Sequence, residues 1–377
     1  MNNRQEKQTL PDRYTKGYSI LSLVAMSGEL PSNQILRLPG GGRYKEERVK
    51  TLKSRGLIQT YYKDKLLGYR LTAESKKALA QENPERFEAL FTGDSETNKP
   101  KYEITRRLRL HTIAETIVTM LNAGVSVYRD EKPGVFYPDF NSEPQPVTSP
   151  AFYNSREIKE LGSEFVKIKN ARSVGVFLTE RKAFIVYNSG ASLLKWDYKS
   201  EMRTKALMKT ILCRERLPHQ YKPEDVQALM LGDSMERMYQ ILTSTGGPKR
   251  NYFILDGNYE RFLFLTNDHN GEFLLKLLCD KEKTDELNSL LSVNLHSQDP
   301  SLLVENDAVD ENGGPVLFAY DCDMPRITRF NAMLRLHGKD GTIICFDFQT
   351  DALRRYCGAN VRIQAIDLQK LKGRFYS

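Results

Sequence analysis

Residues Leu52 to Leu79 read LKSRGLIQTYYKDKLLGYRLTAESKKAL, and this stretch gives the clearest local signals of secondary structure in the sequence. Gly56 is placed to cap the C-terminus of a preceding helix, and the apolar residues after it begin a strand. Lys63-Asp64-Lys65 is a polar hairpin tip from which the chain returns as a second strand. Thr72 can then cap the N-terminus of another helix. The stretch therefore predicts a helix, a basic β-hairpin and a helix in that order.

Two more helices are expected before this stretch. Apolar spacing predicts the first over residues 14–29 and a short second one over residues 34–38. Pro39-Gly40-Gly41-Gly42 is a turn, because consecutive glycines disfavour both helix and strand. The helix that leads into the hairpin is expected over residues 43–55, with Val49 on its inward face. The predicted order is thus three helices followed by a hairpin.

Positive charge is concentrated in this same region. The whole chain carries a formal net charge of +8, and residues 41–80 alone hold eleven Lys and Arg residues against four Asp and Glu, a balance of +7. Such a patch suits a polyanionic partner. The candidate DNA contacts are the charged side chains of the third helix and the hairpin: Arg43, Lys45, Glu47, Arg48, Lys50, Lys53, Arg55, Lys63, Lys65 and Arg70.

Three helices followed by a basic hairpin is the order of a winged helix-turn-helix, and Leu52 to Leu79 resembles the third-helix-to-wing segment of bacterial winged-helix DNA-binding domains. An α-helix fits the major groove, where exposed Arg, Lys and Glu can meet base edges or phosphates. A basic hairpin tip can contact a flanking phosphate or the minor groove. We therefore expect double-stranded DNA as the partner. The alternative is a solvated basic face on a winged helix that docks protein instead.

The chain is expected to divide into four segments, with an α+β or α/β fold class overall. A winged-helix domain spans residues 12–91, and a polar linker spans residues 92–101. Residues 102–170 form a connecting helix, predicted over 102–123, and an irregular segment. A mixed-sheet α/β domain spans residues 171–377. Three arginines of the connecting helix are expected on a solvated face, with a DNA contact as the alternative: Arg106, Arg107 and Arg109.

A short carboxylate pattern lies in the irregular segment. Tyr137-Pro138-Asp139 is followed by Glu157-Ile158-Lys159, which resembles the PD…(D/E)xK pattern of restriction-enzyme-like nucleases. In that chemistry Asp139 and Glu157 would hold Mg²⁺ against the scissile phosphate, and Lys159 would orient a water. Residues 155–162, however, look like a capped helical turn, whereas that fold places its ExK on a strand. An active nuclease, a degenerate nuclease-like scaffold and coincidence all stay open.

Strands alternate with helices through the C-terminal region, which predicts the α/β domain. The expected strands cover residues 173–178, 183–187, 226–231, 252–255, 261–265, 316–320, 342–347 and 361–366. Residues 281–314 are polar and are expected to form a long insertion or surface loop. Asp321, Asp323 and Asp347 lie at strand ends, where carboxylates can hold metal or substrate, although Asp is also an ordinary loop residue. Trp196 is expected to anchor the core.

Composition excludes several other classes of protein. With 40% apolar and 28% charged residues, the chain is globular rather than disordered or collagenous. No apolar run approaches the ~18 residues of a membrane span, and the N-terminal residues lack the apolar core of a secretory signal. The five scattered cysteines have no CxxC spacing, so we expect a cytoplasmic protein without a membrane partner. No P-loop and no His-x-His pair occur, and no cofactor is expected unless the nuclease alternative holds, which requires Mg²⁺.

The winged helix, the charged helix after it and the PD…ExK-like remnant are together similar to replication-relaxation family proteins of plasmids and integrative conjugative elements of Gram-positive bacteria. Segments 155–162, 172–190 and 195–201 also look like parts of uncharacterised proteins from such elements. The resemblance implies a sequence-specific DNA-binding protein that acts in replication, transfer or transcriptional control. A homo-oligomer is expected by analogy, because most winged-helix binders dimerise over two half-sites, and replication or transfer proteins are the further partners. The alternatives are a Mg²⁺-dependent endonuclease or nickase and a scaffold that binds protein.

Overall fold

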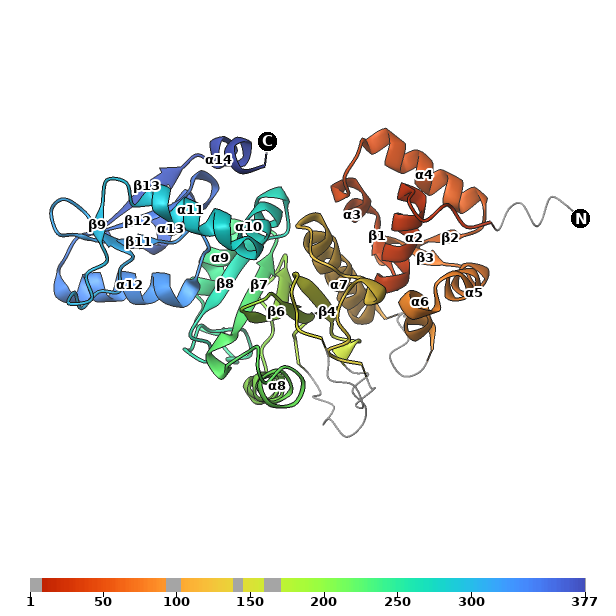
Figure 1. Ribbon diagram of the computed structural model, residues 1–377, viewed down its shortest axis with the longest axis horizontal. Helices are drawn as coiled ribbons and strands as arrows, with labels where there is room; N and C mark the ends of the chain where they lie inside the picture. The colour runs from red at the N-terminus through yellow and green to blue at the C-terminus, as the bar shows by residue number, and fades with distance from the viewer. Residues whose placement is uncertain (1–8, 93–102, 138–144, 159–170, 377) are drawn as a thin grey trace, which may run out of the picture. The chain divides into compact units, whose positions relative to one another are not determined.

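The computed structural model describes residues 9–92, 103–137, 145–158 and 171–376, and Figure 1 shows its helices and strands. The chain forms two compact units. The first comprises residues 1–167 and 174–180, and the second comprises residues 168–173 and 181–377. Both units mix helices with strands, which confirms the predicted α and β composition of the fold.

The N-terminal part of the first unit contains three helices and three strands. In chain order they are α2 (Lys16–Ser27), β1 (Leu30–Pro31), α3 (Ser32–Arg37), α4 (Gly42–Ser54), β2 (Ile58–Lys63) and β3 (Leu66–Leu71). Thr15 caps α2, because its hydroxyl accepts a hydrogen bond from the N–H of Tyr18. Almost every residue of α2 is buried, which is typical of a helix surrounded by other elements.

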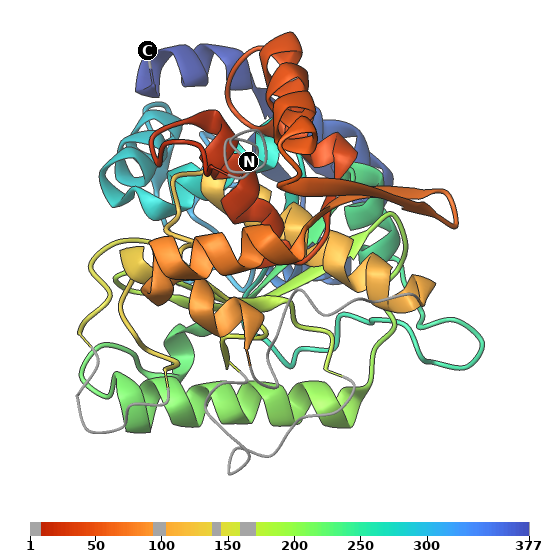
Figure 2. The same ribbon diagram turned by 90° about the vertical axis from the view of Figure 1, so that its right-hand side faces the viewer.

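Strands β1, β3 and β2 form an antiparallel sheet in that order. Lys63 pairs with Leu66, so Asp64 and Lys65 alone make the turn of the β2–β3 hairpin. Their φ angles are 54° and 61°, the left-handed region that a two-residue hairpin turn of type I′ requires at both positions. Neither residue is glycine, so this backbone conformation costs about 1–2 kcal/mol per residue. Figure 2 shows the hairpin extending as a two-stranded arm.

The first unit continues with three more helices and a pair of strands. They are α5 (Ala73–Glu82), α6 (Pro84–Phe91), α7 (Ile104–Asn122), β4 (Ala151–Asn154) and β5 (Gly175–Leu178). Helix α7 packs against α2, α3 and β1. It is therefore part of the core of the first unit and not only a connection to the C-terminal region. Strands β4 and β5 pair antiparallel.

The second unit contains two sets of parallel strands. β6 (Ala183–Gly190), β7 (Val226–Gly232) and β8 (Phe262–Thr266) pair in parallel in that order. Parallel neighbours need a crossover connection, and α8 (Tyr198–Thr210) and α9 (Met235–Leu242) lie on the two connections. All three strands are buried almost throughout, as strands of a parallel sheet usually are.

The other sheet of this unit has the strand order β13-β12-β11-β10-β9. Its strands are β9 (His296–Ser297), β10 (Ala308–Val309), β11 (Pro315–Phe318), β12 (Gly341–Phe346) and β13 (Val361–Ile366). Strands β11, β12 and β13 are parallel, whereas β9 and β10 add antiparallel pairs. The helices that come after the three parallel strands are α12 (Met324–His337), α13 (Thr350–Tyr356) and α14 (Leu368–Phe375).

Two expectations for the second unit are wrong. Residues 252–255 do not form a strand, since Tyr252 makes only an isolated bridge with Lys195. Residues 281–314 are not one long loop, because they contain α11 (Lys281–Leu291), which comes after α10 (His269–Cys279), and the short strands β9 and β10. Among the described helices, none combines the length and the apolar character that crossing a bilayer requires.

Trp196 anchors the core of the second unit, as the sequence predicts. Its side chain is buried, and its ring centroid lies 5.0 Å from that of Tyr187 and 4.7 Å from that of Phe253. Phe253 in turn contacts the ring of Phe262 on β8, at 5.1 Å. Edge-to-face and tilted aromatic contacts of this kind tie the irregular segment around residue 253 to the sheet.

Candidate nucleic-acid interface

Five of the predicted DNA contacts are exposed cations on α4 and the hairpin. Arg43, Lys50 and Lys53 are exposed along α4, and Lys63 and Lys65 are exposed at the hairpin tip. Helix α4 packs against β2, so the helix and the hairpin are neighbours within one unit. The inward side of α4 packs on α2, which leaves its basic side in solvent.

Glu47 pairs with Lys50 on the exposed side of α4. Lys50 Nζ lies 2.7 Å from Glu47 Oε1, and this hydrogen bond raises the pKa of Lys50. Both side chains are more than half exposed, so the pair contributes little to stability. Lys50 can therefore exchange Glu47 for a phosphate oxygen at little cost.

The expectation that Lys45 contacts DNA is wrong. The residue is only 3% exposed, and its Nζ donates hydrogen bonds of 2.7 Å to the backbone carbonyls of Leu36 and Leu38. These carbonyls lie at the C-terminal end of α3, where the last carbonyls of a helix have no helical partner. Lys45 therefore links α4 to α3 through these hydrogen bonds, and its ammonium is not accessible to a polyanion.

Arg70 requires the same correction. Its Nε and Nη2 donate hydrogen bonds of 2.9 and 2.7 Å to Glu29 Oε2, and its side chain is 12% exposed. The guanidinium also lies over the ring of Tyr61, 3.7 Å from the centroid. Arg70 is therefore held inside the first unit, where it joins β3 to the segment immediately after α2.

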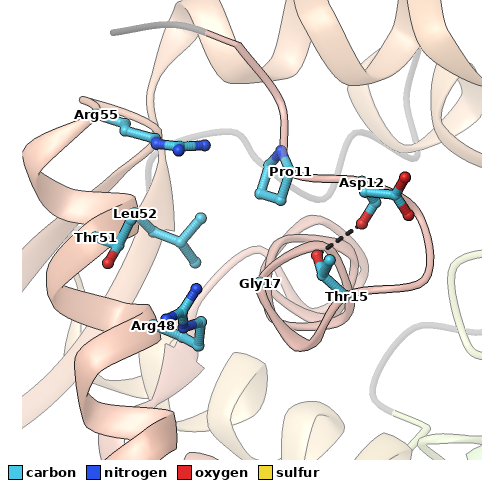
Figure 3. Close-up of a pocket in the computed structure, with 8 residues that line it drawn as sticks. All are labelled: Pro11, Asp12, Thr15, Gly17, Arg48, Thr51, Leu52 and Arg55. Atoms are coloured by element: carbon cyan, nitrogen blue, oxygen red, sulfur yellow. Dashed lines mark hydrogen bonds between the residues drawn. The ribbon is translucent and has the colours of Figure 1, made fainter.

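Arg48 and Arg55 lie on a different stripe of α4 from Lys50. Figure 3 shows both on the side of the helix that faces Pro11 and Gly17, where they line a pocket of about 200 Å³. Both arginines are half-buried. Arg48 lies 4.8 Å from the centroid of the Tyr44 ring, and its buried Nε has no hydrogen-bond partner among the described residues. The ten predicted contacts thus separate into an exposed set, a half-buried pair, and two side chains, Lys45 and Arg70, that are held by partners within the unit.

Glu29 forms a buried charged cluster that the sequence patterns did not indicate. Its side chain is fully buried. Arg107 Nη2 and His111 Nε2 lie 2.5 and 2.8 Å from its Oε1, while Arg70 donates to its other oxygen, Oε2. Gly68 on β3 leaves the space that the Glu29 side chain occupies, because a Cβ at position 68 would lie only 2.6 Å from Glu29 Cγ. The cluster therefore joins α7, the end of α2 and the hairpin.

The expectation that Arg107 lies on a solvated face is also wrong. Its side chain is fully buried, whereas the neighbouring Arg106 is 62% exposed and pairs with Glu103 at 3.2 Å. A signal for this was present in the sequence. Arg107 and His111 are four residues apart, on the helical face that also carries buried Leu110. Two polar residues on an apolar helical face need a partner, and Glu29 supplies it.

The hydrogen bonds around Glu29 lower its pKa. Burial alone would raise the pKa of this carboxyl, but the hydrogen bonds from His111, Arg107 and Arg70 outweigh burial and lower the pKa from 4.5 to about 2. A carboxyl whose pKa is depressed by folding stabilises the folded state above its unfolded pKa. This contribution is lost as the pH falls from about 4.5 to about 2.

We therefore expect acid to weaken the first unit through Glu29 by about 3 kcal/mol. Other carboxylates titrate in the same range, so the comparison is with Glu29→Gln, which has no charge to lose. The stability difference between wild type and E29Q should shrink by about 2–3 kcal/mol between about pH 6 and about pH 2.5. Urea unfolding followed by hydrogen exchange of α2 amides measures it. A difference that does not change with pH contradicts the assignment.

Of the three residues that would carry the nuclease chemistry, Glu157 lies within the described residues, and Asp139 and Lys159 lie outside them. Strand β4 ends at Asn154, so Glu157 lies in the turn after the strand. Its Oε1 accepts hydrogen bonds from the backbone and side-chain N–H groups of Asn154, and its Oε2 lies 2.8 Å from Lys132 Nζ. Within the described ranges, no three His, Cys, Asp or Glu side chains are grouped closely enough to hold a metal ion.

Two of the three strand-end aspartates share one arginine. Arg261 Nε lies 2.8 Å from Asp323 Oδ2, and its Nη2 lies 3.3 Å from Asp321 Oδ2. Burial and the neighbouring charge of Asp323 raise the pKa of Asp321 to about 6. Asp347 comes directly after β12 and is exposed. These distances give Asp321 and Asp323 a role in an ion-pair cluster with Arg261.

Comparison of the chain with models of protein families, with curated proteins and with solved structures finds no match. A functional assignment therefore depends on the residues and contacts described above.

Proposed function

We propose that this chain is a sequence-specific double-stranded DNA-binding protein in which residues 16–71 form a winged helix-turn-helix. The order of α2, β1, α3, α4, β2 and β3 supports the proposal, because that fold has three helices followed by a hairpin. Strand β1 pairs with β3 and so extends the hairpin into a three-stranded sheet. In this proposal α4 is the recognition helix and the β2–β3 hairpin is the wing.

The observation that carries the proposal is the set of exposed cations on α4 and the hairpin. A helix about 10–12 Å across fits a major groove about 12 Å wide. Arg43, Lys50 and Lys53 on α4 can then meet base edges or phosphates, while Lys63 and Lys65 contact the flanking backbone. The exposed carboxylate of Glu47 can accept from a cytosine amino group.

The biological role is proposed from the resemblance to replication-relaxation family proteins. On that basis the chain recognises an origin, promoter or transfer site of a mobile element and acts in replication, transfer or transcriptional control. A homo-oligomer that binds two half-sites belongs to the same proposal, because most helix-turn-helix proteins bind DNA as dimers. Replication or transfer proteins are the further partners that this role requires.

Charge reversal of Lys50 and Lys53 tests the proposal. The K50E/K53E variant should bind duplex DNA at least about tenfold more weakly at moderate salt, because two phosphate contacts become repulsive. The slope of log affinity against log salt concentration should fall by about 2. Fluorescence-anisotropy titrations of a labelled duplex at several salt concentrations measure both quantities.

The matched control is K249E/K339E, which makes the same change in net charge at two exposed lysines of the second unit. We expect this control to bind duplex almost as tightly as wild type. Equal affinities for K50E/K53E and wild type would contradict the proposal. The proposal would also be contradicted if the affinity of the wild-type chain for DNA did not depend on salt. That result would favour the alternative function, a scaffold that binds protein.

A further inference from the structure

Arg107 of α7 holds the backbone of the β2–β3 hairpin at both ends of its turn. Its Nη1 donates a hydrogen bond of 2.7 Å to the carbonyl of Lys63, and its Nη2 donates one of 3.1 Å to the carbonyl of Leu66. These are the two residues that flank the turn. The fixed fork of a guanidinium can reach two such acceptors at once, which a lysine ammonium cannot do with the same geometry.

The turn between these carbonyls is strained, which explains the need for a clamp. Asp64 and Lys65 have φ angles of 54° and 61° without being glycine. A two-residue turn without glycine persists where the surrounding structure fixes it. The two carbonyl bonds from Arg107 span this turn and favour its closed form.

Arg107 is itself rigidly held. Its Nε and Nη2 donate to Glu29, which is fully buried and also bonded to Arg70 on β3. The ring of Tyr61 on β2 lies close to both guanidinium groups, 3.7 Å from that of Arg70 and 4.6 Å from that of Arg107. The hairpin is therefore fixed to α7 through both of its strands and through its turn.

We propose that Arg107 is a positioning residue for DNA binding, which holds the hairpin so that Lys63 and Lys65 reach the backbone phosphates beside the site of α4. The inference rests on the proposed function. It extends the DNA-binding module to α7, a helix that does not itself need to contact DNA. Because α7 also packs on α2 and α3, it supports the helical part and the hairpin of the module together. Arg37 Nη2 donates to Thr119 Oγ1 of α7 at 2.9 Å, which fixes α3 in the same way.

The first experiment measures the clamp without DNA, in the full-length chain. Arg107→Lys keeps the positive charge beside Glu29 but loses the fork that reaches both carbonyls. Amides of residues 58–71 should exchange with deuterium at least about tenfold faster in this variant, while those of α4 change little. Arg106→Lys is the matched control on the same helix, because Arg106 is exposed, and it should exchange like wild type. Unchanged exchange in the hairpin of R107K overturns the proposal.

The second experiment tests whether the clamp acts through the two lysines. R107K should bind duplex DNA about fivefold more weakly than wild type. In the background K63A/K65A, where the contacts are already lost, R107K should have no further effect on affinity. A double-mutant cycle measures this coupling, which a general loss of stability would not produce. An R107K effect of equal size in both backgrounds overturns the proposal.

The two failures can be told apart. If the wild-type chain does not bind duplex DNA, the proposed function fails and the positioning role fails with it. If the wild-type chain binds but the cycle shows no coupling, only the positioning role fails. If R107K does not fold, the variant E29Q/R107Q replaces it, because that variant removes one buried charge of each sign. We expect it to show the same faster exchange of the hairpin amides and the same coupling with K63A/K65A. Additive behaviour of that variant with K63A/K65A also overturns the proposal.

Discussion

Replacing Glu29 by glutamine is expected to lower the free energy of unfolding of the first unit by about 3–5 kcal/mol. Glutamine has the shape of glutamate, so it leaves the close approach to Gly68 unchanged and removes only the charge. Arg107, which is fully buried, and Arg70, which is 12% exposed, then lose their carboxylate partner. Breaking a buried ion pair by removing one member is costly because the other charge stays desolvated.

The matched control is Glu47→Gln, which removes the carboxylate of an exposed pair with Lys50. That change should cost less than about 1 kcal/mol, because exposed ion pairs contribute little. Urea unfolding of both variants, followed by hydrogen exchange of α2 amides, compares the two effects within the same unit. If E29Q is no less stable than E47Q, Glu29 does not hold the cluster together.

Reversing four exposed charges together should almost abolish DNA binding. The variant K50E/K53E/K63E/K65E removes two cations from α4 and two from the hairpin tip. If each lysine releases about one counterion on binding, affinity should fall by about a thousandfold near 0.1 M salt. The effect should exceed that of the α4 variant K50E/K53E, because in the proposed function the hairpin contacts a separate part of the DNA backbone.

The control for this variant is K199E/K249E/K339E/K370E, which reverses four exposed lysines of the second unit. Net charge is then the same in both proteins, and only the position of the charge differs. Fluorescence anisotropy with one labelled duplex compares them directly. Similar losses in the two variants would mean that net charge, and not the α4–hairpin surface, accounts for binding.

Local signals made the hairpin region predictable from the sequence. Gly56 lies just beyond the end of α4, and Lys63-Asp64-Lys65 marks the tip between β2 and β3. Both signals depend on the backbone preferences of a few neighbouring residues, so no distant contact is needed to read them. The same holds for Thr72, whose hydroxyl accepts from the N–H of Ser75 at the start of α5.

Partners distant in sequence made the burial of several charged residues unpredictable. In the sequence, Lys45 cannot be distinguished from the exposed lysines near it. In the structure, its ammonium donates hydrogen bonds to two backbone carbonyls at the end of α3. Arg107 is buried and Arg70 is largely withdrawn from solvent because Glu29, which is 78 and 41 residues away, accepts their hydrogen bonds. Charge density in a sequence thus located the region of the candidate site but could not say which cations face solvent.

The two wrong predictions in the second unit come from apolar patterns that are weak or that fit more than one structure. Helix α11 buries only Leu287 and most of its residues are polar, so its sequence looks like a polar loop. The apolar run at residues 252–255 suggests a strand, but Phe253 serves instead to pack against Trp196. Short apolar runs do not distinguish a strand from a buried loop anchor.

In the proposed function, α4 and the β2–β3 hairpin form one surface that binds the phosphate backbone of DNA. The most direct test is the salt dependence of duplex affinity for the full-length wild-type chain. If the exposed cations Arg43, Lys50, Lys53, Lys63 and Lys65 contact phosphates, the plot of log affinity against log salt concentration should have a slope of about −4.5. No measurable binding, or a slope close to zero, would contradict the account.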